Sequence, residues 1–332
     1  MRCPTLKELP PPPPGKTGWP WSEESHQLPD KMPDGSPWPK ISIVTPSLNQ
    51  CQFIEETIRS VLLQGYPDLE YIIIDGGSSD NSVDTIKKYE NWLAYWVSEQ
   101  DRGQAHAINK GIEQCSGPIF AWINSDDFYN MDVFVRVANL MYQNGITRRK
   151  FIYGNCVEID KQSNPVRLMK GGPTNRKMII RFWRGNAIPQ PSVFMHKKLI
   201  EHDLLNENLQ FVMDWELWAR LSDKTSLHYF PIDFAYFRFY DHSKSGTDWI
   251  CFIEEQRQVL RKYFFEKKIN IKIFLEYLKW EIRFVYHQKI RNILKICLLK
   301  AAGERTYRII KKLKTKYFPH LSKSSLKSLS GE

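Results

Sequence analysis

The sequence predicts an α/β fold, a mixed and mostly parallel sheet flanked by helices, followed by a C-terminal helical extension. Short runs rich in Ile, Val and Tyr alternate with amphipathic stretches between residues 41 and 130. Glycine, serine, aspartate or proline follows each run. The chain has 332 residues and is 42% hydrophobic, which suffices for the core of one large α/β domain or of a domain with an appendage.

The first unit is a strand, a loop and a helix. The run "ISIVT" at residues 41–45 is apolar and β-branched, and it stops at Pro46. In the stretch "QFIEETIRSVLLQG" that follows, Ile54, Ile58 and Val61 fall on one helical face. Gly65 is expected to close this helix.

The same order then repeats. "YIIID" runs into the turn "GGSSDNS", where Asp80 or Ser82 can cap the next helix. "AYWVSE" precedes the turn "QDRGQ" and a third helix, and "PIFAWI" runs into "NSDD". The carboxyl ends of neighbouring parallel strands lie at one edge of a sheet. We therefore expect the polar stretches "TPSLN", "DGGSSD", "QDRGQ" and "NSDD" to lie together there.

Beyond residue 151 the pattern is less regular. "FIYGNCVEI" predicts a strand, "RFWRGNAIPQPSVF" predicts a loop that enters another strand, and "MDWELWARLSD" predicts a helix. "FAYFRFYDH" predicts a last strand with a polar exit. From residue 254 to 316 apolar residues recur at helical spacing among lysines and arginines.

Three regions follow from these patterns: a proline-rich N-terminal arm at 1–39, the α/β domain at 40–250, and a basic helical extension at 251–332. Proline donates no backbone hydrogen bond, so the arm is expected to be extended or polyproline-like. It is either structurally neutral or a ligand for a proline-binding partner.

The net charge of +10 is unevenly distributed, since 20 of the 47 Lys and Arg but only 7 of the 37 acids follow Cys251. The basic extension fits either a membrane-surface element that attracts anionic lipids or a plain packed appendage. The rest of the chain is slightly acidic and shows no nucleic-acid motif, so we expect no nucleic-acid partner. A basic nucleic-acid scaffold would instead show steeply salt-dependent binding.

The six cysteines lie far apart, which indicates neither a disulfide framework nor a zinc site. No charged start precedes an apolar segment, and no apolar run approaches the roughly 18–20 residues of a membrane span. These observations predict a cytoplasmic protein, with peripheral attachment to the inner face of the membrane as an option.

The stretch "NSDD" places Asp126 and Asp127 side by side at the end of an apolar run. Mg²⁺ and Mn²⁺ prefer oxygen ligands and are commonly held by one or two carboxylates, water and substrate phosphates. The two acids therefore fit a metal site, and they equally fit a cap for the helix that follows.

Two neighbouring turns add complementary groups. Asp75 ends one strand and is followed by two glycines that allow close approach of a ligand. Arg102 can donate two hydrogen bonds to phosphate, and Asn109 and Lys110 lie one to two helical turns later. Carboxylates for a metal, basic groups for phosphates and glycine-rich turns together describe a nucleotide-diphosphate pocket.

The chain resembles the family 2 glycosyltransferases over about residues 41–248. The resemblance rests on the ordered motifs "ISIVTPSLNQCQFIEETIRSVLLQGYPDLEYIIIDGGSSDNS", "WVSEQDRGQAHAINKGI", "WINSDD", "QPSVF" and "MDWELWARL". It implies the GT-A fold, which is a Rossmann-like nucleotide-diphospho-sugar transferase architecture, and an inverting, metal-dependent transfer of sugar to a hydroxyl group.

The resemblance also implies roles for single residues. Thr45, Pro46 and Asp75 would hold the base and ribose of the nucleotide, and Asp101 and Arg102 would belong to the same pocket.

In the same resemblance, "NSDD" corresponds to the DXD motif. Asp126 would be a ligand of Mn²⁺ or Mg²⁺, and Asn124 and Asp127 would contact the ribose or support the metal. The chain departs from the family pattern in two places, since Asn124 replaces the first acid of the motif and His106 stands where an acid is expected.

Catalysis would depend on "MDWELW". Asp214 is the predicted base that takes the proton of the acceptor hydroxyl, and Glu216 is the rival. His242 is a second candidate metal ligand, since imidazole suits Mn²⁺, and the alternative at this site is a phosphate contact from Lys244.

The predicted reaction is transfer from a nucleotide-sugar donor, with a UDP-sugar favoured, to a glycan or lipid-linked glycan in bacterial cell-surface polysaccharide synthesis. The alternative is a non-catalytic module that binds a nucleotide-sugar or a glycan, if Asn124 and His106 mark a site that has lost its activity.

Overall fold

The computed structural model describes residues 1–143, 146–181, 188–240, 249–266, 273 and 275–283. The chain divides into two compact units, Met1–Phe239 and Tyr240–Glu332. The elements follow one another as β1 (Ile41–Ser47), α1 (Ile54–Leu62), β2 (Leu69–Asp75), α2 (Ser82–Lys88), η1 (Glu90–Trp92), β3 (Tyr95–Ser98), α3 (Gln104–Gln114), β4 (Ile119–Trp122), β5 (Phe128–Tyr129), α4 (Val133–Met141), β6 (Tyr142–Gln143), β7 (Ile146–Thr147), β8 (Phe151–Ile159), β9 (Pro165–Met169), α5 (Arg176–Ile180), η3 (Gln190–Ser192), β10 (Val193–His196), η4 (Lys197–Leu199), α6 (Met213–Leu221), β11 (His228–Arg238) and α8 (Trp249–Glu266).

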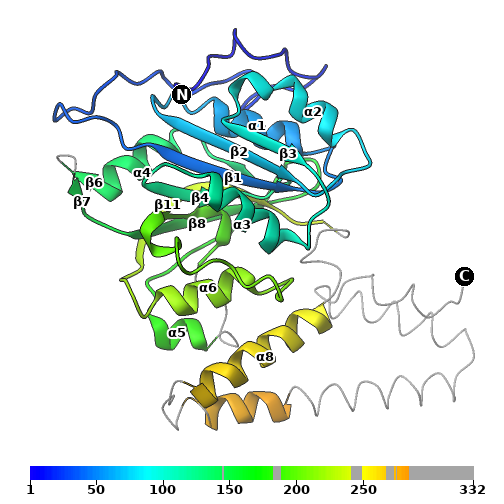
Figure 1. Cartoon of the computed structure of the whole chain (residues 1–332), viewed down its shortest axis with the longest axis vertical. Coiled ribbons are helices and arrows are strands. Elements are labelled where there is room, and N and C mark those ends of the chain that lie inside the picture. Colours follow the sequence, from blue (N-terminus) through cyan, green and yellow to red (C-terminus); the bar gives the residue numbers. More distant parts are fainter. Residues whose placement is uncertain (144–145, 182–187, 241–248, 267–272, 274, 284–332) are drawn as a thin grey trace, which may run out of the picture. The chain divides into compact units, whose positions relative to one another are not determined.

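In the described part of the first unit, nine strands form one sheet in the order β3-β2-β1-β4-β10-β8-β11-β5, with β9 paired to β8 (Figure 1). The strands β3, β2, β1 and β4 are mutually parallel. β10 runs antiparallel to β4 and to β8, whereas β11 is parallel to β8. The mixed α/β sheet flanked by helices, predicted from the sequence, is confirmed.

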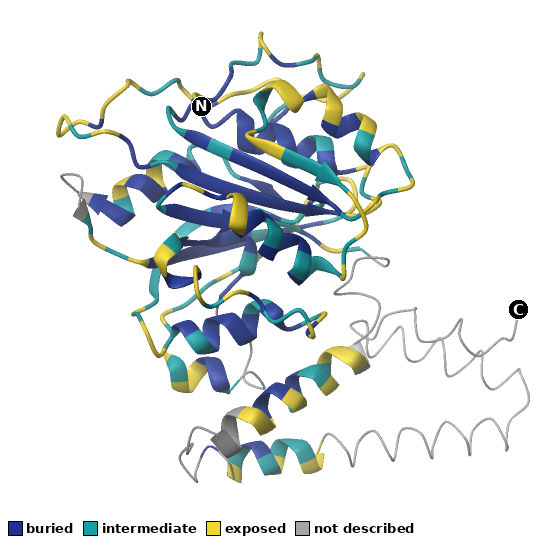
Figure 2. Cartoon of the chain, viewed as in Figure 1, coloured by how far each residue is buried: buried dark blue, intermediate teal, exposed yellow. Residues whose placement is uncertain are grey.

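The central strands are buried on both faces. Every residue of β1 and of β4 is buried, which is the pattern of strands covered by helices on both sides (Figure 2). On α1, the predicted apolar face of Ile54, Ile58 and Val61 has no exposed surface. The alternation of strand and amphipathic helix thus forms the core because each helix can bury one face against the sheet.

The proline-rich segment, expected as an extended arm, packs against this first unit. The amide of Cys3 donates to the carbonyl of Tyr66 at 2.8 Å, and the amide of Leu28 donates to the carbonyl of Gly65 at 2.9 Å. A Cβ on Gly65 would lie 2.2 Å from the carbonyl oxygen of His26, and the φ of this glycine is +62°. Only glycine allows this close passage.

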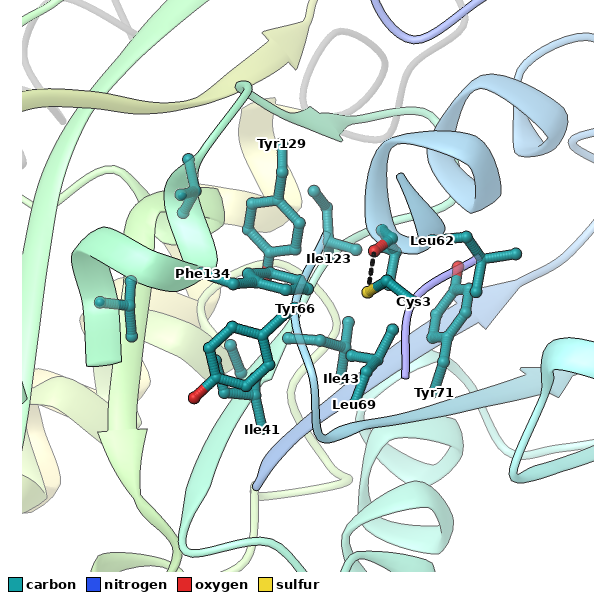
Figure 3. Close-up of a cluster of buried hydrophobic side chains, with 14 of the residues drawn as sticks. Cys3, Ile41, Ile43, Leu62, Tyr66, Leu69, Tyr71, Ile123, Tyr129 and Phe134 are labelled. Atoms are coloured by element: carbon teal, nitrogen blue, oxygen red, sulfur yellow. Dashed lines mark hydrogen bonds between the residues drawn. The ribbon is translucent and has the colours of Figure 1, made fainter. Parts of the chain in front are cut away.

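Apolar side chains between the prolines explain the packing. In Figure 3, Cys3 of this segment lies beside Leu62 and Tyr71 in the hydrophobic core. The buried guanidinium of Arg59 donates to the carbonyls of the segment at Pro10, Pro20 and Trp21. The segment therefore covers the outer side of α1 and satisfies a buried charge there. Its buried apolar residues are Cys3, Leu9, Trp21, Met32 and Trp38.

The second unit contains α8 and a helical stretch at 275–283. Leu260 of α8 is fully buried, and the guanidinium of Arg257 lies 2.7 Å from the carboxylate of Glu281. Within the described residues, no helix is both long enough and apolar enough to cross a membrane. Most of the predicted basic extension, residues 284–332, lies outside the described part.

Candidate active site

The ends of the parallel strands meet at one edge of the sheet. Ser47 at the end of β1 is in register with Asp75 at the end of β2, which is in register with Ser98 at the end of β3. Trp122 at the end of β4 is in register with Val44. The predicted gathering of the polar turns at one edge is thus observed, and it places the residues that follow β1, β2, β3 and β4 next to one another.

Asp75 is buried and organises the turn after β2. Its carboxylate accepts hydrogen bonds from the amide of Gly77 at 3.2 Å, from the amide and hydroxyl of Ser78 at 2.8 and 2.6 Å, and from the hydroxyl of Ser98 at 2.7 Å. Gly77 has a φ of +82°, which glycine adopts without strain. Four donors therefore fix the orientation of this carboxylate.

The end of β1 carries Thr45, Pro46 and Ser47. The hydroxyl of Thr45 is buried and lies 3.0 Å from the phenol oxygen of Tyr71. Pro46 is paired with Ile74 in the parallel ladder. Among the described residues, the buried hydroxyl of Ser47 has no hydrogen-bond partner. A buried hydroxyl without a protein partner is rare in folded proteins and is satisfied where a ligand or water can reach it.

The turn before α3 joins the first two loops. Asp101 accepts a hydrogen bond from the amide of Gly103 at 2.7 Å, and a Cβ on Gly76 would lie 2.6 Å from its other oxygen. Arg102 donates to the carboxylate of Glu207 from Nε at 3.1 Å and from Nη2 at 2.6 Å. Asp101 thus lies against the Asp75 turn, while Arg102 is paired with a carboxylate that sequence reasoning missed.

Asn109 lies inside α3 and is buried. Its Nδ2 donates to the carbonyl of Leu205 at 2.9 Å and to Glu207 at 3.1 Å, and its Oδ1 accepts from the amide of Leu205 at 2.9 Å. The predicted contact of Asn109 with the nucleotide stays a prediction. Its observed partners all belong to the loop before α6.

The "NSDD" turn is held by a chain of hydrogen bonds. Asn124 accepts from Gln104 at 2.6 Å and donates to Oδ2 of Asp127 at 3.1 Å. Gln190 donates to the carbonyl of Trp122 at 3.0 Å and lies 3.4 Å from the amide of Asn124. The turn therefore contacts the first turn of α3 on one side and η3 on the other.

The two acids of this turn have different surroundings. Asp127 is 1% exposed, and its Oδ1 accepts from the amide of Arg238 at 2.8 Å. Asp126 is half-buried, and its main-chain carbonyl accepts from Nε of Arg238 at 2.8 Å. Burial, and secondly the charge of Asp126, raises the pKa of Asp127 well above the usual value for aspartate. Asp126 is thus the more accessible carboxylate.

Arg238, the last residue of β11, supports this turn from inside the protein. Its side chain is 1% exposed and is paired with that of Glu56, which is 7% exposed. Its guanidinium also lies 4.5 Å from the ring centroid of Phe53. A buried arginine with a full set of partners stabilises the adjacent acids by its charge and holds their backbone by its hydrogen bonds.

Sequence reasoning missed Arg238. The signal available was a single charged residue in the aromatic run "FAYFRFY" of a predicted strand. A charge that interrupts such a run is either a solvent-facing residue or a buried partner of another charge, and the sequence alone does not distinguish the two.

Of the two acids in this turn, one is suited to hold a divalent metal. Asp127 is buried and both of its oxygens accept hydrogen bonds from the protein, whereas Asp126 is half-buried and is the more accessible candidate ligand. Within the described residues, no cluster of three or more His, Cys, Asp and Glu side chains could hold a metal. Metal sites at phosphates commonly use one or two carboxylates with water and phosphate oxygens, and this donor set is compatible with such a site. His242 and Lys244 lie outside the described residues.

The helix α6 begins near the same edge and carries Asp214. Trp218 of α6 stacks on Trp122 of β4 with ring centroids 5.4 Å apart. Four residues before Asp214, the amide group of Gln210 packs so closely on Gly103 that a Cβ there would lie 3.0 Å from it. The packing thus brings the start of α6 against the turn that contains Asp101.

The two acids of α6 also differ. Glu216 is 8% exposed and accepts two hydrogen bonds of 3.0 Å from Nε of Arg220. Asp214 is half-buried, and its Oδ1 accepts from the amide of Trp215 at 2.7 Å. A base must reach a substrate to accept its proton, so the more exposed Asp214 fits this role better than the buried Glu216.

Comparison with known proteins identifies the family. Residues 42–203 match the family model for glycosyl transferase family 2. An uncharacterized glycosyltransferase of Rickettsia conorii is 26% identical over 231 residues, which is 66% of this chain and 37% of the relative. The chain thus spans little more than a third of the length of this curated relative.

Two solved structures share the fold. TarS of S. aureus superposes with a TM-score of 0.56 at 16% identity, covering 72% of this chain and 43% of TarS. The mannosyltransferase PcManGT of Pyrobaculum calidifontis superposes with a TM-score of 0.56 at 15% identity, covering 90% of this chain and 87% of PcManGT. Residues 42–203 thus match a family 2 glycosyltransferase domain, and the two superpositions show the GT-A fold.

Proposed function

We propose that the chain is an inverting, metal-dependent glycosyltransferase that moves a sugar from a nucleotide-diphosphate donor to a hydroxyl acceptor. The observation that supports this most strongly is the convergence of Asp75, Asp101 and the Asp126 turn at one edge of the sheet. PcManGT is described in complex with GDP-Man and Mn²⁺, and TarS in complex with UDP-GlcNAc. A nucleotide-sugar donor fits the same edge here, and a UDP-sugar is the first donor to test.

The donor would lie along the ends of β1 and β2. In this proposal Thr45, Pro46 and Asp75 form the wall for the base and ribose, and the unsatisfied hydroxyl of Ser47 is one hydrogen-bond donor to the ligand. Asp101 belongs to the same wall because it contacts the Asp75 turn.

The diphosphate would lie at the Asp126 turn. Asp126 would hold Mn²⁺ or Mg²⁺, with Asn124 and Asp127 fixing the turn, and His242 is the proposed further ligand. A bound divalent ion would neutralise charge on the departing diphosphate. In this proposal, Asp127 keeps its hydrogen bond from the backbone amide of Arg238 and stabilises the turn.

Asp214 is the proposed catalytic base. Direct displacement requires the acceptor hydroxyl to lose its proton as it attacks the anomeric carbon, and a carboxylate in reach accepts that proton. Base and diphosphate lie on opposite faces of the sugar in such a displacement, which inverts the anomeric configuration. The acceptor is proposed to be a glycan or lipid-linked glycan of the bacterial cell surface, which the bacterial source of the Rickettsia relative supports.

We propose a cytoplasmic location, which the free buried thiols of Cys3, Cys115 and Cys156 support because a reducing compartment keeps thiols free. Contact of the basic extension with the membrane surface is a separate proposal. Truncation after Ser245 followed by liposome sedimentation tests it: binding to anionic vesicles should fall, and unchanged binding rejects the membrane role.

A thermal-shift screen of nucleotide-sugars with and without Mn²⁺ tests the proposed function. A donor that binds only the folded state raises Tm, since ligand at 100 times its Kd stabilises by about 2.7 kcal/mol. We expect a shift that requires Mn²⁺ and release of the nucleotide on incubation with that donor. Absence of any shift across the screen would contradict the proposal.

A non-catalytic binding module is the second candidate, and the observation in its favour is Asn124 at the first position of the DXD motif. The amide of Asn124 brings no charge to a metal. Tight nucleotide-diphosphate binding without donor hydrolysis or transfer would favour this module.

A further inference from the structure

The loop at residues 203–212 leads into α6 and contacts α6 itself, the helix α3 and the turn before α3. Its first residues are tied to α6 itself, because Arg220 donates to the carbonyls of Asp203 at 3.2 Å and Leu204 at 2.8 Å. Leu205, Leu209 and Val212 are buried. The loop and α6 are therefore held together. The contacts that join them to the rest of the unit fix the position of the first turn of α6.

Asn109 of α3 makes the central attachment. Its side-chain amide pairs with both the carbonyl and the amide of Leu205, as a neighbouring strand would, and both distances are 2.9 Å. Asn109 is 4% exposed, so loss of these bonds would leave the polar groups of Leu205 unsatisfied in the interior. No smaller or apolar side chain reproduces this two-way pairing.

Glu207 makes a second attachment, with both carboxylate oxygens in use. Oε1 accepts from Asn109 at 3.1 Å, and Oε2 accepts from Arg102 at 2.6 Å. Burial alone would raise the pKa of Glu207, but the hydrogen bonds from Asn109 and Arg102 hold it below the usual value. One carboxylate thus links the loop to α3 and to the turn in front of α3.

Gln210 makes the third attachment, against Gly103. The φ of Gly103 is +114°, a conformation that strains any other residue, and its Cβ position is filled by the side-chain amide of Gln210. The same turn contains Asp101, which lies against Gly76 in the turn after β2, where the donor is proposed to bind. A continuous set of contacts therefore runs from the Asp75 turn through Asp101 and Gly103 to Gln210, in the segment before Asp214.

We propose that Asn109 and Glu207 are positioning residues. They fix the loop before α6 and thereby hold Asp214 at a fixed place relative to the edge of the sheet where the donor is proposed to bind. This inference rests on the proposed function, because it assigns Asp214 as the base. It differs from the prediction, made from the spacing after Arg102, that Asn109 lines the nucleotide pocket, since here the amide acts on the loop. Neither residue is proposed to touch the substrate.

The test combines Glu207→Ala, Glu207→Gln and Asn109→Asp with a matched control. Glu207→Ala removes all three hydrogen bonds at a partly exposed site, and Glu207→Gln keeps an acceptor of the same length. Asn109→Asp keeps the acceptor for Leu205 but places a second carboxylate beside Glu207. The control is Glu99→Gln, which breaks the exposed ion pair of Glu99 with Lys110 on the same helix.

Hydrogen exchange of amides 203–215 is the first readout, because it does not require activity. We expect faster exchange in Glu207→Ala and Asn109→Asp and unchanged exchange in the control. For transfer, kcat in Glu207→Ala should fall by about tenfold or more, since small displacements of a reacting group are costly, while the donor KM does not rise. Glu207→Gln should recover part of kcat.

The outcomes separate the two proposals. Unchanged exchange in both disruptive variants overturns the inference, and so does faster exchange with unchanged kcat. A fall in Tm alone, with kcat per folded molecule retained, would show a purely structural role and also overturn it. If the wild-type chain transfers no sugar from any donor, the proposed function fails, and exchange then decides whether Asn109 and Glu207 hold the loop.

Discussion

Two pairs of acids close in sequence belong to the candidate active site, and the fold buries the two members of each pair to different extents. At the exit of β4, Asp127 is buried against Arg238, whereas Asp126 is half-buried. In the first turn of α6, Glu216 is buried and pairs with Arg220, whereas Asp214 is half-buried and accepts a hydrogen bond from the amide of Trp215. In each pair, one acid is buried, and the other is more exposed and is the candidate for chemistry.

The two pairs show that carboxylates of the same chemistry take different roles when their surroundings differ. Two neighbouring carboxylates repel each other, and burial makes the repulsion more costly. At the exit of β4, the guanidinium of Arg238 lies beneath the turn and reduces that cost, and in α6 an (i, i+4) arginine pairs with Glu216. The more buried acid of each pair is then the poorer candidate for contact with a metal or a substrate.

The largest expected effect separates the two acids of α6. Asp214→Asn should lower kcat for sugar transfer by about 10²- to 10⁴-fold, the usual contribution of a general base, while nucleotide binding stays nearly intact. Glu216→Gln should retain most of the transfer and lower Tm instead. Initial velocities at saturating donor measure both. Equal losses of kcat in the two variants would remove the distinction between them.

The next effect concerns the support under the first pair. Arg238→Met leaves Glu56 buried without its partner and should cost about 3–5 kcal/mol of unfolding free energy. Adding Glu56→Leu should recover much of this loss. Urea unfolding measures both variants.

Arg2→Met is the matched control, since the side chain of Arg2 is 40% exposed and its ion-pair partner Asp30 is 92% exposed. This change should cost about 0–1 kcal/mol. If Arg238→Met costs no more than the control, the buried pair does not support the acidic turn.

A smaller effect divides the two acids at the exit of β4. Asp126→Asn should weaken Mn²⁺-dependent binding of a nucleoside diphosphate about 10- to 100-fold, in line with loss of one charged contact of about 1.5–3 kcal/mol. Asp127→Asn should weaken it less, because the oxygens of Asp127 are already bonded within the protein. Calorimetric titration with and without Mn²⁺ gives both values. A stronger effect at Asp127 would reverse the assignment.

The smallest effect is a pH dependence of stability in the absence of metal. The folded-state pKa of Asp127 is raised, so the folded state binds more protons than the unfolded chain above about pH 4, the pKa of an unfolded aspartate. Stability should therefore fall as pH rises from about 4 towards the folded-state pKa. Asp127→Asn should flatten this part of the curve. Thermal melts in chelator at successive pH values measure it, and an identical slope in both proteins would show that Asp127 is not the titrating group.

The parallel part of the fold could be predicted because its signals are local. The runs that became β1, β2, β3 and β4 each end in a turn, and the helices between them show apolar residues at helical spacing. The same rule placed the turns at one edge of the sheet. By contrast, the position of β11 between β8 and β5 depends on pairing between distant segments, which no local pattern encodes.

Burial explains what the sequence left open. The proline content of the first 39 residues predicted an extended arm, yet Trp21 and Trp38 anchor this segment to the core. Asn109 has the same residue type whether it faces a ligand or a loop, and only the position of Leu205 distinguishes these cases. Arg238 was missed because a buried ion pair requires a partner, here Glu56, that lies 182 residues away in sequence.

A crystal structure of the chain with its nucleotide-sugar donor and Mn²⁺ tests the division of roles most directly. We expect a carboxylate oxygen of Asp126 among the metal ligands, with Asp127 still bonded to the amide of Arg238 and Asp214 facing the anomeric carbon from the side opposite the diphosphate. A metal held by Asp127 in place of Asp126, or a donor bound away from this edge of the sheet, would contradict the account.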